Sequence, residues 1–225
     1  MFNFVASALA LSSAVFGLAP ANSGAAPADL GERQQVVHAD LGGDAQSAYA
    51  DLDGDGRADR VTLRTVDGDL DEQILTARVG GERLTATVPS GLIAGPQPMR
   101  VVDVDADGRD EVIVTELVGA NTNHYGVWGL YGNALAPVKL ADGTQLRLME
   151  GGGLAAIVRY GCTDDHDGRQ LIQTSGQAVD IDYTLYEGEY VVYVVDGGVA
   201  NEVARVPVSG PRDTPGFYAD PTLCR

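Results

Sequence analysis

The chain has 225 residues, of which 44% are hydrophobic and 21% are charged, so it is long enough for one large folded domain or two small ones. Its 32 acidic and 15 basic residues give a net charge of −17 at pH 7. A balance this acidic argues against nucleic acid and anionic membranes as partners.

The N-terminal segment predicts export. Residues 1–26 carry no charged side chain, residues 4–18 form an apolar run, and residues 19–21 match an A-x-A cleavage pattern. Because the run is too short to span a bilayer, we interpret residues 1–26 as a signal peptide and expect a secreted, extracellular protein without membrane insertion. A buried N-terminal helix is the alternative. Residues 27–43 then form a linker with a first strand near Val37.

Carboxylates at regular spacing dominate the next stretch. In residues 51–59, acids occupy positions 1, 3, 5 and 9 and glycine occupies position 6. A near copy with the same pattern begins 103 − 51 = 52 residues later, over residues 103–111. The acids are Asp51, Asp53, Asp55 and Asp59 in the first stretch, and Asp103, Asp105, Asp107 and Glu111 in the second.

Four carboxylates in one tight turn repel one another, so a cation is needed to hold them together. Hard oxygen ligands in a flexible loop suit Ca²⁺, and we expect the carbonyl oxygens of position 7, Arg57 and Arg109, to complete the two sites. An EF-hand is excluded, because position 12 is Thr62 in one stretch and Val114 in the other instead of Glu. The alternative is that the Asp-Gly pairs are ordinary hairpin turns.

Each acidic stretch leads directly into a strand-like run, residues 60–66 and 111–117. An acidic calcium loop followed by a strand and repeated at about 50 residues resembles the FG-GAP (VCBS-type) repeats of integrin-like β-propellers. The resemblance covers roughly residues 44–207. It implies four-stranded blades in which the calcium loop joins the first two strands.

The rest of the pattern is also β. Short runs rich in Val, Leu, Tyr and Thr alternate with Gly, Asp and Asn turns, and Gly80-Gly81 is typical of a hairpin turn. No sustained helical period of apolar residues follows the signal sequence. The predicted strands are 61–66, 73–79, 83–88, 111–117, 125–131, 135–140, 155–160, 179–185, 190–195 and 200–206.

These strands predict an all-β fold with about three four-stranded antiparallel units, over residues 44–97, 98–153 and 154–209. The third unit carries a weaker loop, residues 163–171, in which only Asp165 and Asp167 keep the acidic pattern. We expect this third site to be degenerate, because affinity follows the number of charged ligands. Closed propellers need at least four blades, so we expect a partial or small propeller, an open arc, or closure by oligomerisation.

The two cysteines, Cys162 and Cys224, are an even number in a chain predicted to be exported, which favours a disulfide. The bond would tether the C-terminal tail, residues 210–225, to the third unit. Two free thiols are the alternative.

Two functions from different classes are consistent with these features. The first is a secreted calcium-binding β-repeat protein whose metal is structural and whose loops bind an extracellular protein or glycan; residues 119–126, which include His124, are a candidate binding loop. The second is a secreted hydrolase acting on glycans or esters, with Asp164 and Asp165 as a candidate acid and base. We favour the first, because no catalytic spacing is present and no stretch outside the repeats is long enough for a separate catalytic domain.

Overall fold

The computed structural model describes residues 45–66, 69–91, 95–165 and 168–224. The predicted signal peptide, residues 1–26, and the predicted linker, residues 27–43, lie outside these ranges. Within them the fold is all-β, as the sequence predicts, and contains no α-helix. No helix of the described residues has the length and the apolar character needed to cross a membrane.

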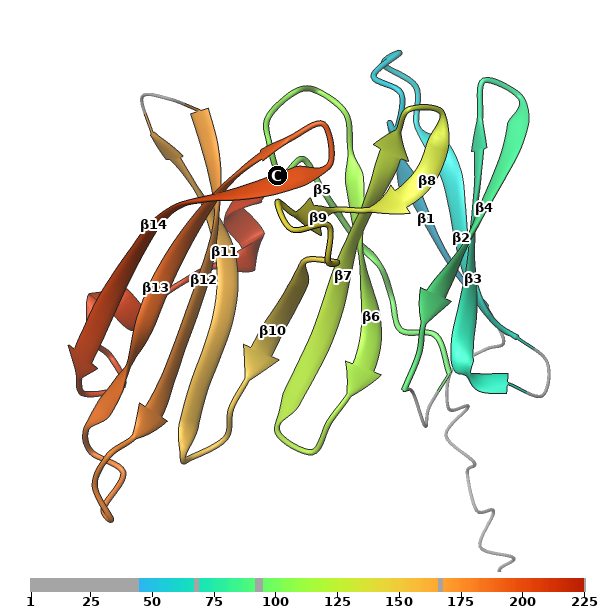
Figure 1. Ribbon diagram of the computed structural model, residues 1–225. Coiled ribbons are helices and arrows are strands. Elements are labelled where there is room, and N and C mark those ends of the chain that lie inside the picture. The colour runs from blue at the N-terminus through green and yellow to red at the C-terminus, as the bar shows by residue number, and fades with distance from the viewer. Residues whose placement is uncertain (1–44, 67–68, 92–94, 166–167, 225) are drawn as a thin grey trace, which may run out of the picture. The chain divides into compact units, whose positions relative to one another are not determined.

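The first sheet has four antiparallel strands in the order β1-β2-β3-β4 (Figure 1). The β3–β4 hairpin turns at Gly80 and Gly81, whose φ angles of 57° and 88° are those of a type I′ turn, as the Gly-Gly pair predicts. The strands are β1 (Ala45–Ala50), β2 (Asp59–Val66), β3 (Asp69–Val79) and β4 (Glu82–Pro89).

The second sheet has ten strands in the described part of the chain. Its order is β5-β6-β7-β10-β11-β12-β13-β14-β9, and β8 pairs with residues 128–131 of β7, beyond the residues that pair with β10. Only the short pairing of β14 with β9 is parallel. The strands are β5 (Arg100–Val102), β6 (Glu111–Val118), β7 (Thr122–Tyr131), β8 (Ala134–Pro137), β9 (Lys139–Leu140), β10 (Arg147–Gly151), β11 (Ala156–Asp165), β12 (Gly168–Ala178), β13 (Tyr186–Asp196) and β14 (Val199–Gly210).

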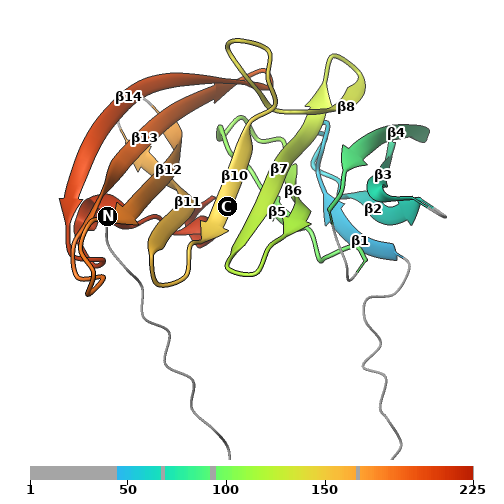
Figure 2. The ribbon, with the colours of Figure 1, turned by 60° about the horizontal axis from the view of Figure 1, so that its bottom comes forward.

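Strand β10 differs most from the sequence prediction, which places no strand at residues 147–151. It pairs with β7 through Leu148 and Tyr125 and with β11 through Gly151 and Val158. Figure 2 shows β10 between these two strands. The second and third predicted units therefore share one continuous sheet, and the described strands close into neither a barrel nor a propeller.

Two further strand predictions need correction. Residues 179–185, predicted as a strand, form the loop between β12 and β13, because the Asp180 carboxylate accepts the backbone N–H groups of Thr184 and Leu185 and turns the chain. The sequence analysis instead missed β12, because it assigned residues 163–171 to a loop. Residues 135–140 are divided between β8 and β9.

Strand β6 separates two hydrophobic cores, because its side chains alternate between the two faces of the sheet. Val112 and Val114 pack against Leu63 and Leu75 of the first sheet, in a cluster that includes Trp128. Ile113 points to the other face and belongs to the cluster that continues across the second sheet. Burial on both sides fixes β6 and, with it, the position of the loop that precedes it. Trp128 lies in the core shared with the first sheet, with 3% of its surface exposed.

The C-terminal tail is held against the second sheet at two points. Cys162 of β11 forms the predicted disulfide with Cys224. Phe217, in the short 3₁₀ helix η1 (Pro215–Phe217), is fully buried and packs with Ile157 and Tyr186. A second 3₁₀ helix, η2 (Pro221–Leu223), precedes Cys224.

Candidate metal centre

The two acidic stretches form corresponding connections in the fold. The first acidic loop, residues 51–59, joins β1 to β2, and the second acidic loop, residues 103–111, joins β5 to β6. In both loops the residue at position 2, Leu52 or Val104, is fully buried and anchors the loop in a core. The acidic positions are thus placed at the rim of the sheets while the loop itself is fixed by hydrophobic packing.

The same backbone hydrogen bonds shape both loops. Two bonds span the loop: the N–H of position 2 donates to the position-9 carboxylate, and the N–H of position 6 donates to the position-1 carboxylate. Two further bonds are local, because the N–H groups of positions 5 and 7 each donate to the carboxylate two residues earlier. The pairs are Leu52 to Asp59 (3.2 Å), Gly56 to Asp51 (2.8 Å), Asp55 to Asp53 (3.2 Å) and Arg57 to Asp55 (2.8 Å) in the first loop. They are Val104 to Glu111 (3.1 Å), Gly108 to Asp103 (3.3 Å), Asp107 to Asp105 (3.3 Å) and Arg109 to Asp107 (2.8 Å) in the second.

The two loops also share their unusual backbone angles. Positions 4 and 6 have positive φ: 76° at Gly54 and 80° at Gly56, and 57° at Ala106 and 85° at Gly108. A left-handed alanine is unfavourable, so the second loop accepts strain to reproduce the path that glycine allows in the first. The two nine-residue stretches therefore adopt one conformation.

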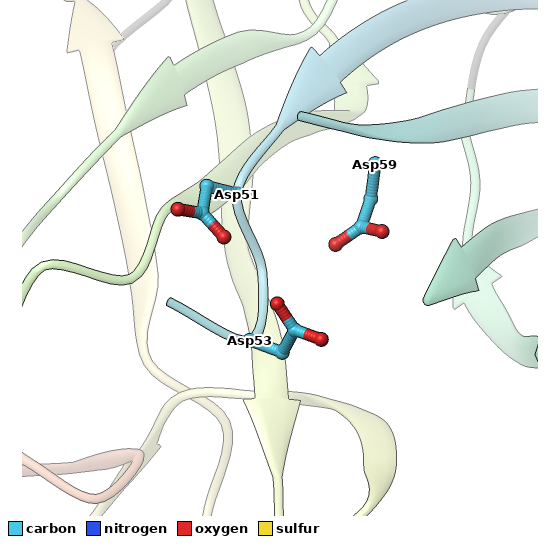
Figure 3. Close-up of side chains that lie close together, drawn as sticks. All are labelled: Asp51, Asp53 and Asp59. Atoms are coloured by element: carbon cyan, nitrogen blue, oxygen red, sulfur yellow. The ribbon is translucent and has the colours of Figure 1, made fainter. Parts of the chain in front are cut away.

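This conformation brings three carboxylates of each loop together. In each group one oxygen per residue can be chosen so that all lie within 4.8 Å of one another. Figure 3 shows the carboxylates of the first group turned toward a common space. The groups are Asp51, Asp53 and Asp59 in the first loop, and Asp103, Asp105 and Glu111 in the second, that is, positions 1, 3 and 9 in both.

The second group is the more buried of the two. Glu111 is only 2% exposed, and its carboxylate accepts the Val104 N–H and the hydroxyl of Tyr131, which is 3.1 Å away. Burial raises the pKa of Glu111 to about 8, and the negative charge of Asp105 adds to the effect. Burial, followed by the charge of Asp107, raises the pKa of Asp105 to about 6. Neither Asp105 nor Glu111 forms an ion pair with a basic side chain of the described residues.

One oxygen in this group has no partner. Oδ1 of Asp103 is buried and makes no hydrogen bond with the described residues. A buried carboxylate oxygen without a partner is costly, so it marks a place where a positive ligand fits. In the first loop, burial raises the pKa of Asp59, and the charges of Asp53 and Asp55 raise it further.

The donor set in both loops consists of oxygen atoms alone, which suits a hard cation such as Ca²⁺ and not a metal that prefers nitrogen or sulfur. Each group of three acids could therefore hold a metal ion. Asp55 and Asp107 lie outside the two groups, and each instead closes the turn by accepting the position-7 N–H. Coordination by the carbonyl oxygens of Arg57 and Arg109 stays a prediction.

The loops contact one another and the third unit. Asp51 is hydrogen-bonded to Asp110 of the second loop through both its N–H and its carbonyl oxygen. The backbone of Asp103 is bound from the C-terminal tail and from the third unit: its N–H donates to the Cys224 carbonyl at 3.1 Å, and its carbonyl accepts from Nη1 of Arg169 at 2.7 Å. The position-1 residue of each loop is thus fixed by a neighbouring unit.

The third stretch, residues 163–171, takes a different form. Asp165 of β11 pairs with Gly168 of β12, so the flanks of the predicted loop are strand. Asp164 forms an ion pair with Arg169 at 2.8 Å, and the guanidinium keeps the pKa of Asp164 below its usual value. Asp167 and His166 lie outside the described residues.

The sequence analysis missed several residues that support the sites, namely Asp110, Tyr131 and Arg169. Of these three, only Asp110 could have been suspected from the sequence, because it is an acid at position 8 of the second acidic loop. The candidate binding loop, residues 119–126, is largely strand, because β7 begins at Thr122 and His124 pairs with Met149 of β10.

The chain matches no protein-family model, and no curated protein matches it.

Proposed function

We propose that this protein is an exported, calcium-stabilised β-repeat protein that serves as a binding or adhesion module for an extracellular ligand. The observation that carries the proposal is that two loops, 52 residues apart in sequence, share one conformation and one arrangement of three converging carboxylates. The likeness to FG-GAP repeats, with the β1–β4 sheet as one blade of a propeller-like array, is part of the same proposal.

The role proposed for the metal is structural. Each acidic loop joins two neighbouring strands, so a cation bound there stabilises the hairpin and its register only when the chain is folded. Without the cation, the carboxylates repel one another, although Glu111 is buried and the other five are partly buried. Asp51, Asp53 and Asp59 would hold one ion, and Asp103, Asp105 and Glu111 the other.

Export is supported by the apolar N-terminal run and by the disulfide between Cys162 and Cys224, since disulfides persist in oxidising compartments. A binding role suits a strongly acidic protein with several open loops at the sheet ends.

The test is thermal unfolding with and without calcium. Removing divalent cations with EDTA should lower the melting temperature by about 5 °C or more, and excess Ca²⁺ should restore it. Asp53→Ala and Asp105→Ala should each reduce the calcium-dependent shift, whereas Asp196→Ala, which removes an exposed acid at the end of β13, should leave it unchanged. An identical melting curve in EDTA and in calcium would refute the structural role of the metal.

A further inference from the structure

A hollow of about 570 Å³ lies at the end of the second sheet, next to the loop that joins β12 to β13. Its walls come from three segments distant in sequence: strand β11, this loop, and the chain that follows β14. The lining residues are Arg159, Tyr183, Thr184, Pro211, Arg212, Asp213, Thr214 and Tyr218.

Tyr183 lines the hollow with its backbone in an unfavourable conformation. Its φ is 55°, a left-handed angle that a bulky residue rarely adopts. Asp180 imposes the turn, because its carboxylate accepts the N–H groups of Thr184 and Leu185 and the Thr184 hydroxyl. Tyr183 remains 43% exposed, so the strain is not compensated by burial in a core. Strain of this kind is concentrated at ligand-binding sites.

Arg159 provides an available positive charge. It is half-buried, and its guanidinium makes no hydrogen bond or ion pair with the described part of the chain. The other arginine in the wall, Arg212, is fixed: it donates to the carbonyl oxygens of Gly153 and Ala156 and lies over the ring of Tyr186, 5.0 Å from its centroid. With Asp213 as the one acid in the lining, the hollow has a net charge of 2 − 1 = +1 in a chain of net charge −17.

These groups match the chemistry of an acidic sugar. A guanidinium without a partner binds one carboxylate through paired N–H donors. The exposed rings of Tyr183 and Tyr218 offer apolar surface to the C–H face of a pyranose, and Asp213 and Thr214 offer hydrogen-bonding oxygens to its hydroxyls. A single net positive charge suits a carboxylate better than a doubly charged phosphate, which the acidic chain would repel.

We propose that this hollow binds a carboxylate-bearing saccharide, a hexuronate unit of an extracellular glycan, with Arg159 on the carboxylate and Tyr183 on the sugar ring. The inference rests on the proposed binding role and names its site and ligand class. It does not require the metal, because none of the hollow's lining residues belongs to either acidic loop.

The experiment is a titration of the protein, without added calcium, with a glucuronate-containing trisaccharide, followed by NMR shifts and calorimetry. The methyl ester of the same trisaccharide removes only the charge and should bind at least about tenfold more weakly. Arg159→Gln should weaken binding of the acid by about tenfold and leave binding of the ester unchanged. Tyr183→Asn keeps a residue that tolerates a left-handed backbone and removes the ring, so it should weaken both sugars alike.

The matched controls are Arg83→Gln, an exposed arginine of β4, and Ile181→Asn, in the same loop as Tyr183 but absent from the lining of the hollow. Both should bind like the wild type. Three results would each overturn the proposal. The acid and the ester could bind with equal affinity, or Arg159→Gln could bind the acid like the wild type. The third is saturable binding only of a peptide with a free C-terminal carboxylate. Because calcium-dependent melting is measured separately, failure of sugar binding leaves the metal proposal standing, and loss of the calcium effect leaves the sugar site standing.

Discussion

Asp51 and Asp110, 59 residues apart in sequence, hold each other by two hydrogen bonds. The Asp51 N–H donates to Oδ2 of Asp110, and the Asp110 N–H donates to the Asp51 carbonyl, both at 2.7 Å. Asp51 is position 1 of the first acidic loop and Asp110 is position 8 of the second. The side chain of Arg109 also lies against the first loop, with its Cγ 3.2 Å from the place that a Cβ on Gly54 would occupy. The two acidic loops are thus linked by two direct hydrogen bonds and by the contact of Arg109 with Gly54.

Asp110→Ala is therefore expected to weaken calcium binding at the first loop by several-fold, although Asp110 is in neither group of converging acids. The substitution leaves the Asp51 N–H without its acceptor, and the loop loses its fixed starting point. Calorimetric titration of calcium measures the effect. Asp110→Asn keeps an acceptor oxygen and should retain most of the affinity. Equal loss in both variants would show that charge, and not the hydrogen bond, is responsible.

The pKa of Glu111 predicts how the metal-free protein responds to pH. Its folded pKa of about 8 lies above the ordinary value of 4.5, so between these values the folded state keeps a proton that the unfolded state has released. The free energy of unfolding should then fall as pH rises through this range, by up to about 1.4 kcal/mol per pH unit. Urea unfolding from about pH 5 to about pH 8 measures this slope.

Glu111→Gln should flatten that slope, and excess calcium should remove it in the wild type, because the cation takes the place of the proton. The partly buried Asp105, with its pKa of about 6, contributes in the same direction over the lower part of the range. An unchanged slope in Glu111→Gln would contradict the assignment of the effect to this carboxylate.

The disulfide should contribute strongly to stability. It joins residues 62 apart, for which loop-closure entropy gives about 4 kcal/mol, so Cys162→Ser with Cys224→Ser should lower the free energy of unfolding by about that amount. Because the Cys224 carbonyl accepts the Asp103 N–H, the same variant should also bind calcium more weakly at the second loop. Reductant should destabilise the wild type and leave the double variant unaffected. A wild-type calcium titration in the double variant would show that the tail does not support the second loop.

Phe217 tests whether the tail is an integral part of the fold. It is fully buried between Ile157 and Tyr186, so Phe217→Ala should cost about 3–5 kcal/mol in unfolding free energy, and Phe217→Leu considerably less. Leu223→Ala, in the same tail but 55% exposed, should change stability by less than about 0.5 kcal/mol. Equal effects of Phe217→Ala and Leu223→Ala would mean that the tail does not pack as described.

The all-β class and the hairpin turn at Gly80-Gly81 could be predicted, because alternation of apolar residues and glycine's access to positive φ are properties of short stretches. The pairing of Cys162 with Cys224 was predictable because no other cysteine competes. Strand β10 was not predictable, since residues 147–151 become a strand only because β7 and β11 lie on either side to receive their hydrogen bonds. The loop at residues 179–185 was misread because the Asp180 turn overrides an apolar alternation typical of a strand.

The sequence by itself determined the conformation of the two acidic loops, because the spacing of carboxylates, the backbone N–H groups that they accept and the residues able to turn left-handed all lie within nine positions. Only the tertiary structure decided that Asp51 is bound to Asp110, and that Arg159 and Tyr183 share one hollow. Contacts between residues far apart in the chain depend on how the sheets pack, and packing arises from the whole set of buried side chains acting together.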